Sequence, residues 1–278
     1  AALAAQGGAS ARQRRARRAS VCEEAARQID LDLPRTFPDH AEFATADGRS
    51  MLRRVLCAHC ARSPQVGYTQ SLNFLAAFLL LQLPARVEGG LGREEAAFWL
   101  LECVIERLLP SYFTAQLTGV LADTRTLDAL VASHPQLHAL PPHLESLGLD
   151  LSLVSTQWLM LGFVTALPSE TALRVWDLFL SLGVRALFAA ALATLRLLRA
   201  TLLAATSFEA AYKALKALHE PALDCDAFVR LMTEELAALS PERLCELRSA
   251  HVPAVLREQA ERERARSASR AAAPARRR

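Results

Sequence analysis

The chain has 278 residues, of which 52% are apolar and 22% charged, and its formal net charge is +3 at pH 7. This apolar content suffices to bury one extended core or two lobes, which excludes a chain that is disordered overall. The small positive charge comes largely from arginines near the two ends, so no basic face for nucleic acid is indicated. Six cysteines without a secretory signal favour a reducing compartment and free thiols.

The two ends of the chain differ in composition from the middle. Residues 1–20 are rich in arginine and poor in acid, and we expect a basic, flexible arm there, with a transit peptide as the alternative. Residues 21–250 should form the folded domain. Residues 251–278 predict a charged helix, with Glu258 and Arg262 paired one turn apart, followed by an Ala/Arg-rich tail.

A short polar motif stands near the start of the predicted domain. Residues 29–38 read Ile-Asp-Leu-Asp-Leu-Pro-Arg-Thr-Phe-Pro. Proline fixes its own φ and pushes the preceding residue towards extended geometry, so Arg35, between Pro34 and Pro38, should lie on a stiff loop just beyond a helix end. We expect its side chain to project outward.

A second motif precedes a long apolar run. Residues 67–73 read Gly-Tyr-Thr-Gln-Ser-Leu-Asn. Gln70 lies directly before the apolar run that begins at Leu72, and Ser71 is the expected N-cap of the helix formed by this run. Gln70 should therefore also lie at a rigid helix edge.

Arginine and glutamine together are the two side chains that accelerate GTP hydrolysis. A guanidinium stabilises the negative charge that shifts over the phosphoryl oxygens, and its planar fork stays charged. An amide orients the attacking water because it both donates and accepts hydrogen bonds. From spacing alone, however, Arg35 is more often a surface arginine and Gln70 a polar residue at a helix start.

The rest of the chain shows helical periodicity. Apolar residues recur at helical spacing over residues 51–59, 101–108 and 184–204, and none of these segments shows sustained strand alternation. Prolines and glycines divide the chain into about ten or more helices of ordinary length. The predicted fold is all-α without a β-sheet. The apolar runs 74–83 and 151–167 are too short or too polar for the roughly twenty residues of a membrane span.

Other chemistry finds little support in the sequence. Cys57, His59 and Cys60 have metal-binding residue types, but tetrahedral zinc needs four ligands and no second pair stands at ligand spacing, so packing on a helix is favoured. No Gly-x-Ser-x-Gly motif indicates a nucleophile. No Gly-x-x-x-x-Gly-Lys loop indicates GTP binding by the chain itself.

The two motifs strongly resemble the signatures of the TBC domain, a family of GTPase-activating proteins for Rab GTPases. Ile29, Asp32 and Arg35 match the signature Ile-x-x-Asp-x-x-Arg, and Tyr68 and Gln70 match Tyr-x-Gln. Further matches follow in family order over about residues 25–220. They include residues 52–56, 97–99 and 173–177. Residues 25–28 and 150–154 look most similar to the Armus-type members, which act on endosomal Rabs.

The resemblance implies a two-lobed helical TBC domain over residues 21–250 and a dual-finger mechanism. Arg35 would be the arginine finger, and Gln70 would replace in trans the glutamine of a GTP-bound Rab. Four residues would hold the fingers or contact the Rab: Ile29, Asp32, Tyr68 and Asn73. GTP and Mg²⁺ belong to the partner, so we expect no cofactor or metal of the chain's own. The implied location is the cytoplasm, with recruitment to endosomal or other endomembranes through the Rab or through domains outside this chain.

Two departures from the family pattern keep a second hypothesis open. The family has glycine and methionine after the glutamine, where this chain has Ser71 and Leu72, and serine does not take positive φ cheaply. The family's upstream Arg-and-Trp signature has no counterpart in residues 1–28, so we expect a fragment of a longer protein. A Rab-binding scaffold without catalysis is the alternative function. An unrelated helical-repeat adaptor would require the ordered motifs to be coincidental.

Overall fold

The computed structural model describes residues 11–272, which contain thirteen α-helices and no β-strand, only an isolated bridge between Arg86 and Gly92. The predicted all-α fold without a sheet is confirmed. The chain divides into two compact units, Ala1–Arg107 and Leu108–Arg278. The first ten residues of the predicted basic arm and the last six of the predicted tail lie outside the described residues.

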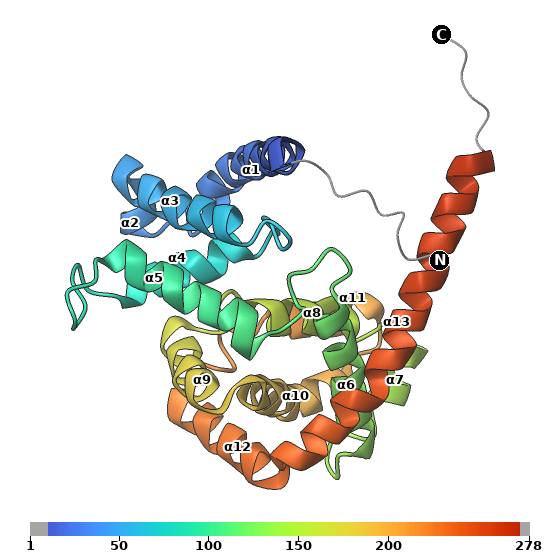
Figure 1. Ribbon diagram of the computed structural model, residues 1–278. Coiled ribbons are helices and arrows are strands. Elements are labelled where there is room, and N and C mark those ends of the chain that lie inside the picture. The colour runs from blue at the N-terminus through green and yellow to red at the C-terminus, as the bar shows by residue number, and fades with distance from the viewer. Residues whose placement is uncertain (1–10, 273–278) are drawn as a thin grey trace. The chain divides into compact units, whose positions relative to one another are not determined.

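The first unit is built around an apolar helix. Its helices are α1 (Ala11–Asp32), the 3₁₀ turn η1 (Leu33–Arg35), α2 (Ala41–Ala44), α3 (Ala46–Arg62), α4 (Leu72–Gln82) and α5 (Arg93–Cys103). The π-helical turn η2 (Val104–Leu108) follows α5, and its last residue is the first of the second unit. The apolar side chains of α4 lie on all of its sides, and most of them are buried. Helices α3 and α5 pack against α4 and against each other (Figure 1). This core fixes the two turns that carry the sequence motifs.

Residues 11–20 depart from the flexible arm that the sequence predicts, since they are the first turns of α1. Alanine, arginine and glutamine are strong helix formers, and the prediction from charge left this propensity aside. At the other end of the core, Ser71 occupies the predicted N-cap position of α4, but its side chain makes no capping hydrogen bond.

The second unit surrounds another apolar helix. Its helices are α6 (Thr118–Ser133), α7 (Leu140–Ser146), α8 (Ser152–Leu161), α9 (Ser169–Leu182), α10 (Val184–Ala204), α11 (Phe208–Lys216), α12 (Cys225–Ala238) and α13 (Pro241–Ala272). Helix α10 packs against α7, α8, α9, α11 and α12. In length and hydropathy α10 also meets the criteria for a membrane span, which the sequence analysis overlooked, but 67% of its most apolar window is buried within the fold, as in a core helix.

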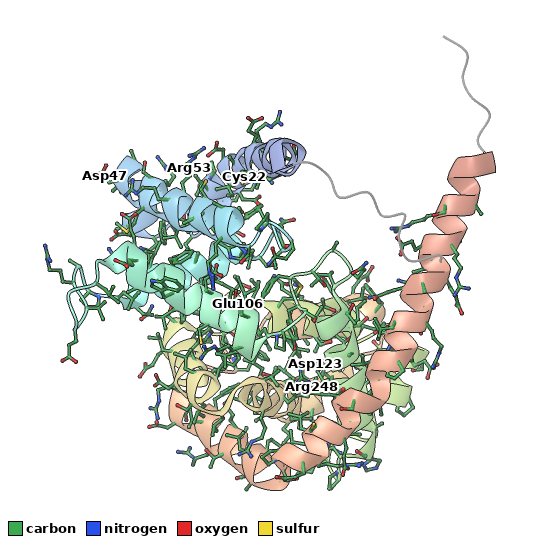
Figure 2. The ribbon with its side chains drawn as sticks, viewed as in Figure 1. Cys22, Asp47, Arg53, Glu106, Asp123 and Arg248 are labelled. Atoms are coloured by element: carbon green, nitrogen blue, oxygen red, sulfur yellow. The ribbon has the colours of Figure 1, made fainter. Side chains whose placement is uncertain are left out.

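Helix α13 crosses the predicted boundary between residues 250 and 251 without a break. It starts at Pro241 and passes through Pro253, although proline removes one helical hydrogen bond. Contacts with α6 hold it on both sides of Pro253. Arg248 pairs with Asp123 before it (Figure 2), and after it the hydroxyl of Thr118 donates to Gln259.

The direct partner of Glu258 is not the predicted Arg262 but Arg125 of α6, at 2.6 Å. The hydrogen bond from Arg125 lowers the pKa of the Glu258 carboxyl, and Arg262 helps to lower it only through its charge. Because Arg125 lies on a neighbouring helix, no spacing within residues 251–278 indicates this partner. The charged segment therefore packs against α6 along part of its length instead of forming a purely solvent-exposed helix.

Candidate functional site

The first motif forms a tight, anchored turn at the end of α1. Ile29 is fully buried and Leu33 is buried, so this end of the helix is fixed in the core. Thr36 is also fully buried, and its hydroxyl donates to the carbonyl of Asp32 at 2.8 Å. Arg35 lies between these anchors as the last residue of η1, and its side chain is exposed, as the sequence predicts.

An exposed ion pair braces the same turn. The Nε and Nη2 groups of Arg53 on α3 donate to the two carboxylate oxygens of Asp30, at 2.7 and 3.1 Å. The hydrogen bond from Arg53 lowers the pKa of the Asp30 carboxyl. Because such pairs are screened by solvent, this one contributes little to stability and serves mainly to orient the turn.

The second motif forms another constrained turn, between α3 and α4. The amide groups of Val66 and Gly67 donate to the carbonyl of Ser63, and Gly67 has the left-handed φ of 65° that glycine accepts readily. The Leu72 amide donates to the Thr69 carbonyl at 3.1 Å. Gln70 is exposed at this turn.

Side-chain hydrogen bonds join the two turns. The hydroxyl of Tyr68 donates to Asp32 at 2.7 Å. The amide nitrogen of Asn73 donates to the Thr36 hydroxyl at 2.7 Å, and its oxygen accepts from the Ser71 amide at 3.1 Å. Burial and the hydrogen bond to Asp32 raise the pKa of Tyr68 well above its ordinary value, so this hydroxyl remains a donor at neutral pH.

Arg35 and Gln70 therefore leave adjoining turns that are bonded to each other on either side of both residues. Within residues 11–272, neither side chain makes a hydrogen bond or an ion pair. A rigid frame that presents an unpaired guanidinium and an unpaired carboxamide can place both on a substrate without first breaking internal bonds.

Sequence reasoning found four members of this frame and missed a fifth. Ile29, Asp32, Tyr68 and Asn73 lie where the motifs suggest, but Thr36 was given no role although it connects the two turns. A threonine directly after a proline-containing turn often bonds to a nearby carbonyl, and this signal was present in the sequence.

We expect Tyr68→Phe to lower the free energy of unfolding by about 1–2 kcal/mol, because it leaves the half-buried Asp32 carboxylate without its donor. It should also lower any activity that depends on the relative placement of the two turns. Urea denaturation of both proteins measures the first effect. Tyr212→Phe is the matched control. It keeps the ring that stacks on Phe208 of α11, so this substitution should change stability by less. Equal stability of the Tyr68→Phe chain and the unmodified chain would show that the hydrogen bond from Tyr68 to Asp32 does not stabilise the fold.

Ser71 occupies a backbone conformation that favours glycine. Its φ is 116°, which a side chain with a Cβ adopts only at a cost of about 1–3 kcal/mol. Ser71→Gly should therefore stabilise the chain by about 1 kcal/mol, after the greater entropy of glycine in the unfolded chain is subtracted. The midpoint of urea denaturation should rise. Ser50→Gly, at an exposed position in α3, should lower the midpoint instead. A lower midpoint for both variants would show that the backbone of Ser71 is not strained.

The Cys57–Cys60 segment has a structural role in α3. His59 is fully buried, and its Nδ1 lies 2.5 Å from Glu102 of α5. Glu102 also accepts from the Ser63 hydroxyl at 3.3 Å, which ties α5 to the start of the Gln70 turn. Burial raises the pKa of the Cys60 thiol to about 12, so it stays protonated at neutral pH. Among residues 11–272, no three His, Cys, Asp or Glu side chains gather as metal ligands.

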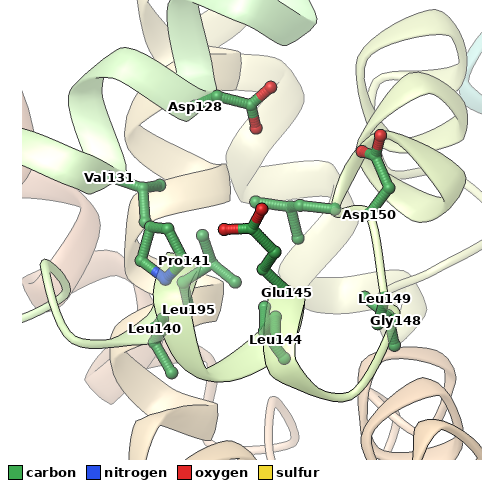
Figure 3. A pocket seen from close by; sticks show the side chains of 11 residues that line it. Asp128, Val131, Leu140, Pro141, Leu144, Glu145, Gly148, Leu149, Asp150 and Leu195 are labelled. Carbon is green, nitrogen blue, oxygen red and sulfur yellow. The ribbon is translucent and has the colours of Figure 1, made fainter.

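The second unit contains a separate cavity of about 460 Å³ with apolar walls and three carboxylates. Figure 3 shows Asp128, Glu145 and Asp150 around it. Burial, together with the negative charge of Asp150, raises the pKa of Asp128 to about 6, and Arg125 partly opposes this rise. None of the residues that the sequence predicts as fingers or supports belongs to this cavity.

The raised pKa of Asp128 makes stability depend on pH. The folded state holds the proton up to about pH 6, whereas the unfolded state releases it near pH 3.8, so stability falls as pH rises between these values. We expect Asp128→Asn to stabilise the chain by about 1–2 kcal/mol near pH 7.5 and by much less near pH 4, after a discount for solvent screening. Urea denaturation at both pH values measures this. An equal gain at both would contradict the shift.

Comparison with known proteins places these features in a family. The model of the Rab-GTPase-TBC domain matches residues 5–203. TBC1 domain family member 2A of Mus musculus is 35% identical over 238 residues, which are 84% of this chain and 25% of that protein. Growth hormone-regulated TBC protein 1 of Xenopus laevis is 32% identical over 225 residues, 79% of this chain and 63% of that protein.

Solved structures give the same result. The Chlamydomonas flagellar RabGAP TBC domain superposes with a TM-score of 0.65 at 28% identity, covering 78% of this chain and 72% of that one. The Ypt/Rab-GAP domain of Gyp1p has a TM-score of 0.66 at 19% identity, covers 78% of this chain and 73% of that one, and shows the shared fold. The chain spans about a quarter of the length of TBC1 domain family member 2A. The chain belongs to the Rab-GTPase-TBC domain family.

Proposed function

We propose that this chain is a GTPase-activating protein for a Rab-family GTPase in its GTP-bound form, with Arg35 and Gln70 acting in trans. The observation that carries the proposal is the bonded pair of turns that presents both side chains exposed and unpaired. Family membership supports a Rab as the partner. The proposed partner supplies GTP and Mg²⁺, and we assign the chain no cofactor or metal of its own.

The chemistry follows from the two side-chain types. In the proposed complex, the Arg35 guanidinium lies against the phosphoryl oxygens and stabilises the charge that develops in the transition state. The Gln70 carboxamide accepts a hydrogen bond from the attacking water through its oxygen and can donate one through its nitrogen, which orients that water. Asp32, Tyr68, Thr36 and Asn73 hold both groups in place.

We further propose a cytoplasmic protein that reaches endosomal or other endomembranes through its Rab partner or through domains outside this chain. This placement depends on the activity, since a Rab-directed activator acts where the GTP-bound Rab lies. Recruitment would regulate vesicle traffic by ending the signal of that Rab.

A Rab-binding scaffold without catalysis is the second candidate, and the conformation of Ser71 favours it. A strained residue directly after Gln70 can displace the glutamine from the position that a glycine would allow. In that case the chain would bind a GTP-bound Rab through the same surface and leave its hydrolysis rate unchanged.

Single-turnover GTP hydrolysis by a panel of purified Rabs, with and without the full chain, distinguishes the two candidates. Faster hydrolysis by at least one Rab supports the activator. Binding to GTP-loaded Rabs at an unchanged hydrolysis rate supports the scaffold, and Ser71→Gly should then be tested for a gain of activity. A chain that neither binds nor activates any Rab contradicts both.

A further inference from the structure

A cavity of about 550 Å³ lies in the second unit, and none of its lining residues belongs to either finger-bearing turn. The end of α9, the start of α10 and the first half of α13 line it. Two arginines belong to its wall, Arg185 from α10 and Arg248 from α13. The proposed finger mechanism uses neither.

Arg248 is held in place by one buried acid, and part of its guanidinium makes no hydrogen bond with the described residues. Its Nε donates to Asp123 at 2.7 Å, and Figure 2 shows the two side chains together. The other carboxylate oxygen of Asp123 accepts a hydrogen bond from the hydroxyl of Tyr112. Among residues 11–272, the Arg248 guanidinium makes no further hydrogen bond, so its two terminal amino groups are uncommitted.

Arg185 has no acidic partner in the described part of the chain. Its Nε is buried and makes no hydrogen bond there. A buried donor without an acceptor costs about 1–3 kcal/mol, and native proteins rarely leave one in that state. The Nε group of Arg185 is thus a donor at the cavity wall that no described residue uses.

The first turn of α10 belongs to the same wall. Val184 and Arg185 are the first residues of α10, and the N-cap residue Gly183 provides no side chain to cap them. The amide groups of an uncapped first turn carry partial positive charge and bind anions. With Asp123 as the one acid against two guanidinium groups on the cavity wall, the lining carries excess positive charge.

We propose that this cavity binds a phosphate monoester that carries an apolar group. Two guanidinium forks from different helices, together with helix amides, match a dianionic phosphate with several oxygens better than a single carboxylate. The remaining wall offers apolar surface from Leu182, Val184 and Leu244 to the body of the ligand. A soluble ester and a lipid headgroup share this chemistry.

Calorimetric titration of the full chain with n-hexyl phosphate tests the site, with glycerol 3-phosphate as the ester without an apolar chain. We expect a dissociation constant of about 0.1–1 mM for hexyl phosphate. Arg185→Gln should weaken binding at least tenfold, since it removes a charged donor but keeps most of the side-chain length. Arg230→Gln, an exposed arginine on α12, is the matched control and should leave binding unchanged. Thermal unfolding of each variant verifies its fold.

Vesicle flotation identifies the source of the phosphate. Dependence on Arg185 for binding to phosphatidic acid vesicles, but not to phosphatidylserine vesicles of equal charge, indicates a lipid headgroup. Binding of hexyl phosphate without binding to either vesicle indicates a soluble ester. The proposal is overturned if hexyl phosphate gives no heat of binding up to about 5 mM. It is also overturned if the unmodified and Arg185→Gln chains bind hexyl phosphate with equal affinity. A loss as large in Arg230→Gln would also overturn it, because binding would then reflect general surface charge.

Discussion

Replacing Arg35 with alanine should lower the stimulated rate of GTP hydrolysis by about a thousandfold to a hundred-thousandfold, the range for an arginine supplied in trans. This corresponds to roughly 4–7 kcal/mol of barrier. The effect should be on the chemical step, because the guanidinium acts on charge that develops in the transition state. Single-turnover hydrolysis at saturating chain concentration with a responsive Rab measures it.

The fold should survive this substitution, because Arg35 is exposed and makes no side-chain bond within residues 11–272. Arg35→Lys keeps the charge but loses the planar fork, and it should restore only a small part of the rate. Arg86→Ala, an exposed arginine between α4 and α5, is the matched control. A folded Arg35→Ala chain that stimulates hydrolysis within a few fold of the unmodified chain would show that Arg35 is not the finger.

Local patterns were sufficient to predict the fold class. The period of buried residues in α3 and α10 appears directly in the sequence, because a helix places its core residues at fixed spacing. Helix ends were harder. Charge alone predicted a flexible arm over residues 11–20, but helix propensity extends α1 through this segment. Charge also predicted a boundary after residue 250, but packing on α6 carries α13 through it.

The candidate site could be predicted only in part, for a physical reason. The exposure of Arg35 follows from the prolines around it, which is local information. The bond between Tyr68 and Asp32 spans 36 residues, and the bond between Asn73 and Thr36 spans 37. No periodicity encodes pairings over such separations, so the two turns could be recognised from the sequence but the bonds that join them could not.

Gln70→Ala should also lower the stimulated rate, by about a hundredfold to a thousandfold, the range for losing one positioned hydrogen-bonding group in a transition state. The smaller effect than for Arg35 follows from charge, since a neutral amide stabilises the transition state less than a guanidinium does. The fold should not change, because Gln70 is exposed and its side chain makes no hydrogen bond within residues 11–272, so binding to the GTP-loaded Rab should change little. Single-turnover rates and binding are measured on the same variant.

A Rab whose own catalytic glutamine is replaced by alanine separates the two possible sources of the amide. If Gln70 orients the water, the unmodified chain should still activate this Rab, and Gln70→Ala should fail to do so. If the Rab's own glutamine does this work, the altered Rab should resist even the unmodified chain, and Gln70→Ala should retain its effect on the normal Rab. The second result would reduce the mechanism to a single arginine finger, and the bonds from Tyr68 and Asn73 would then serve to hold the turn that carries Arg35.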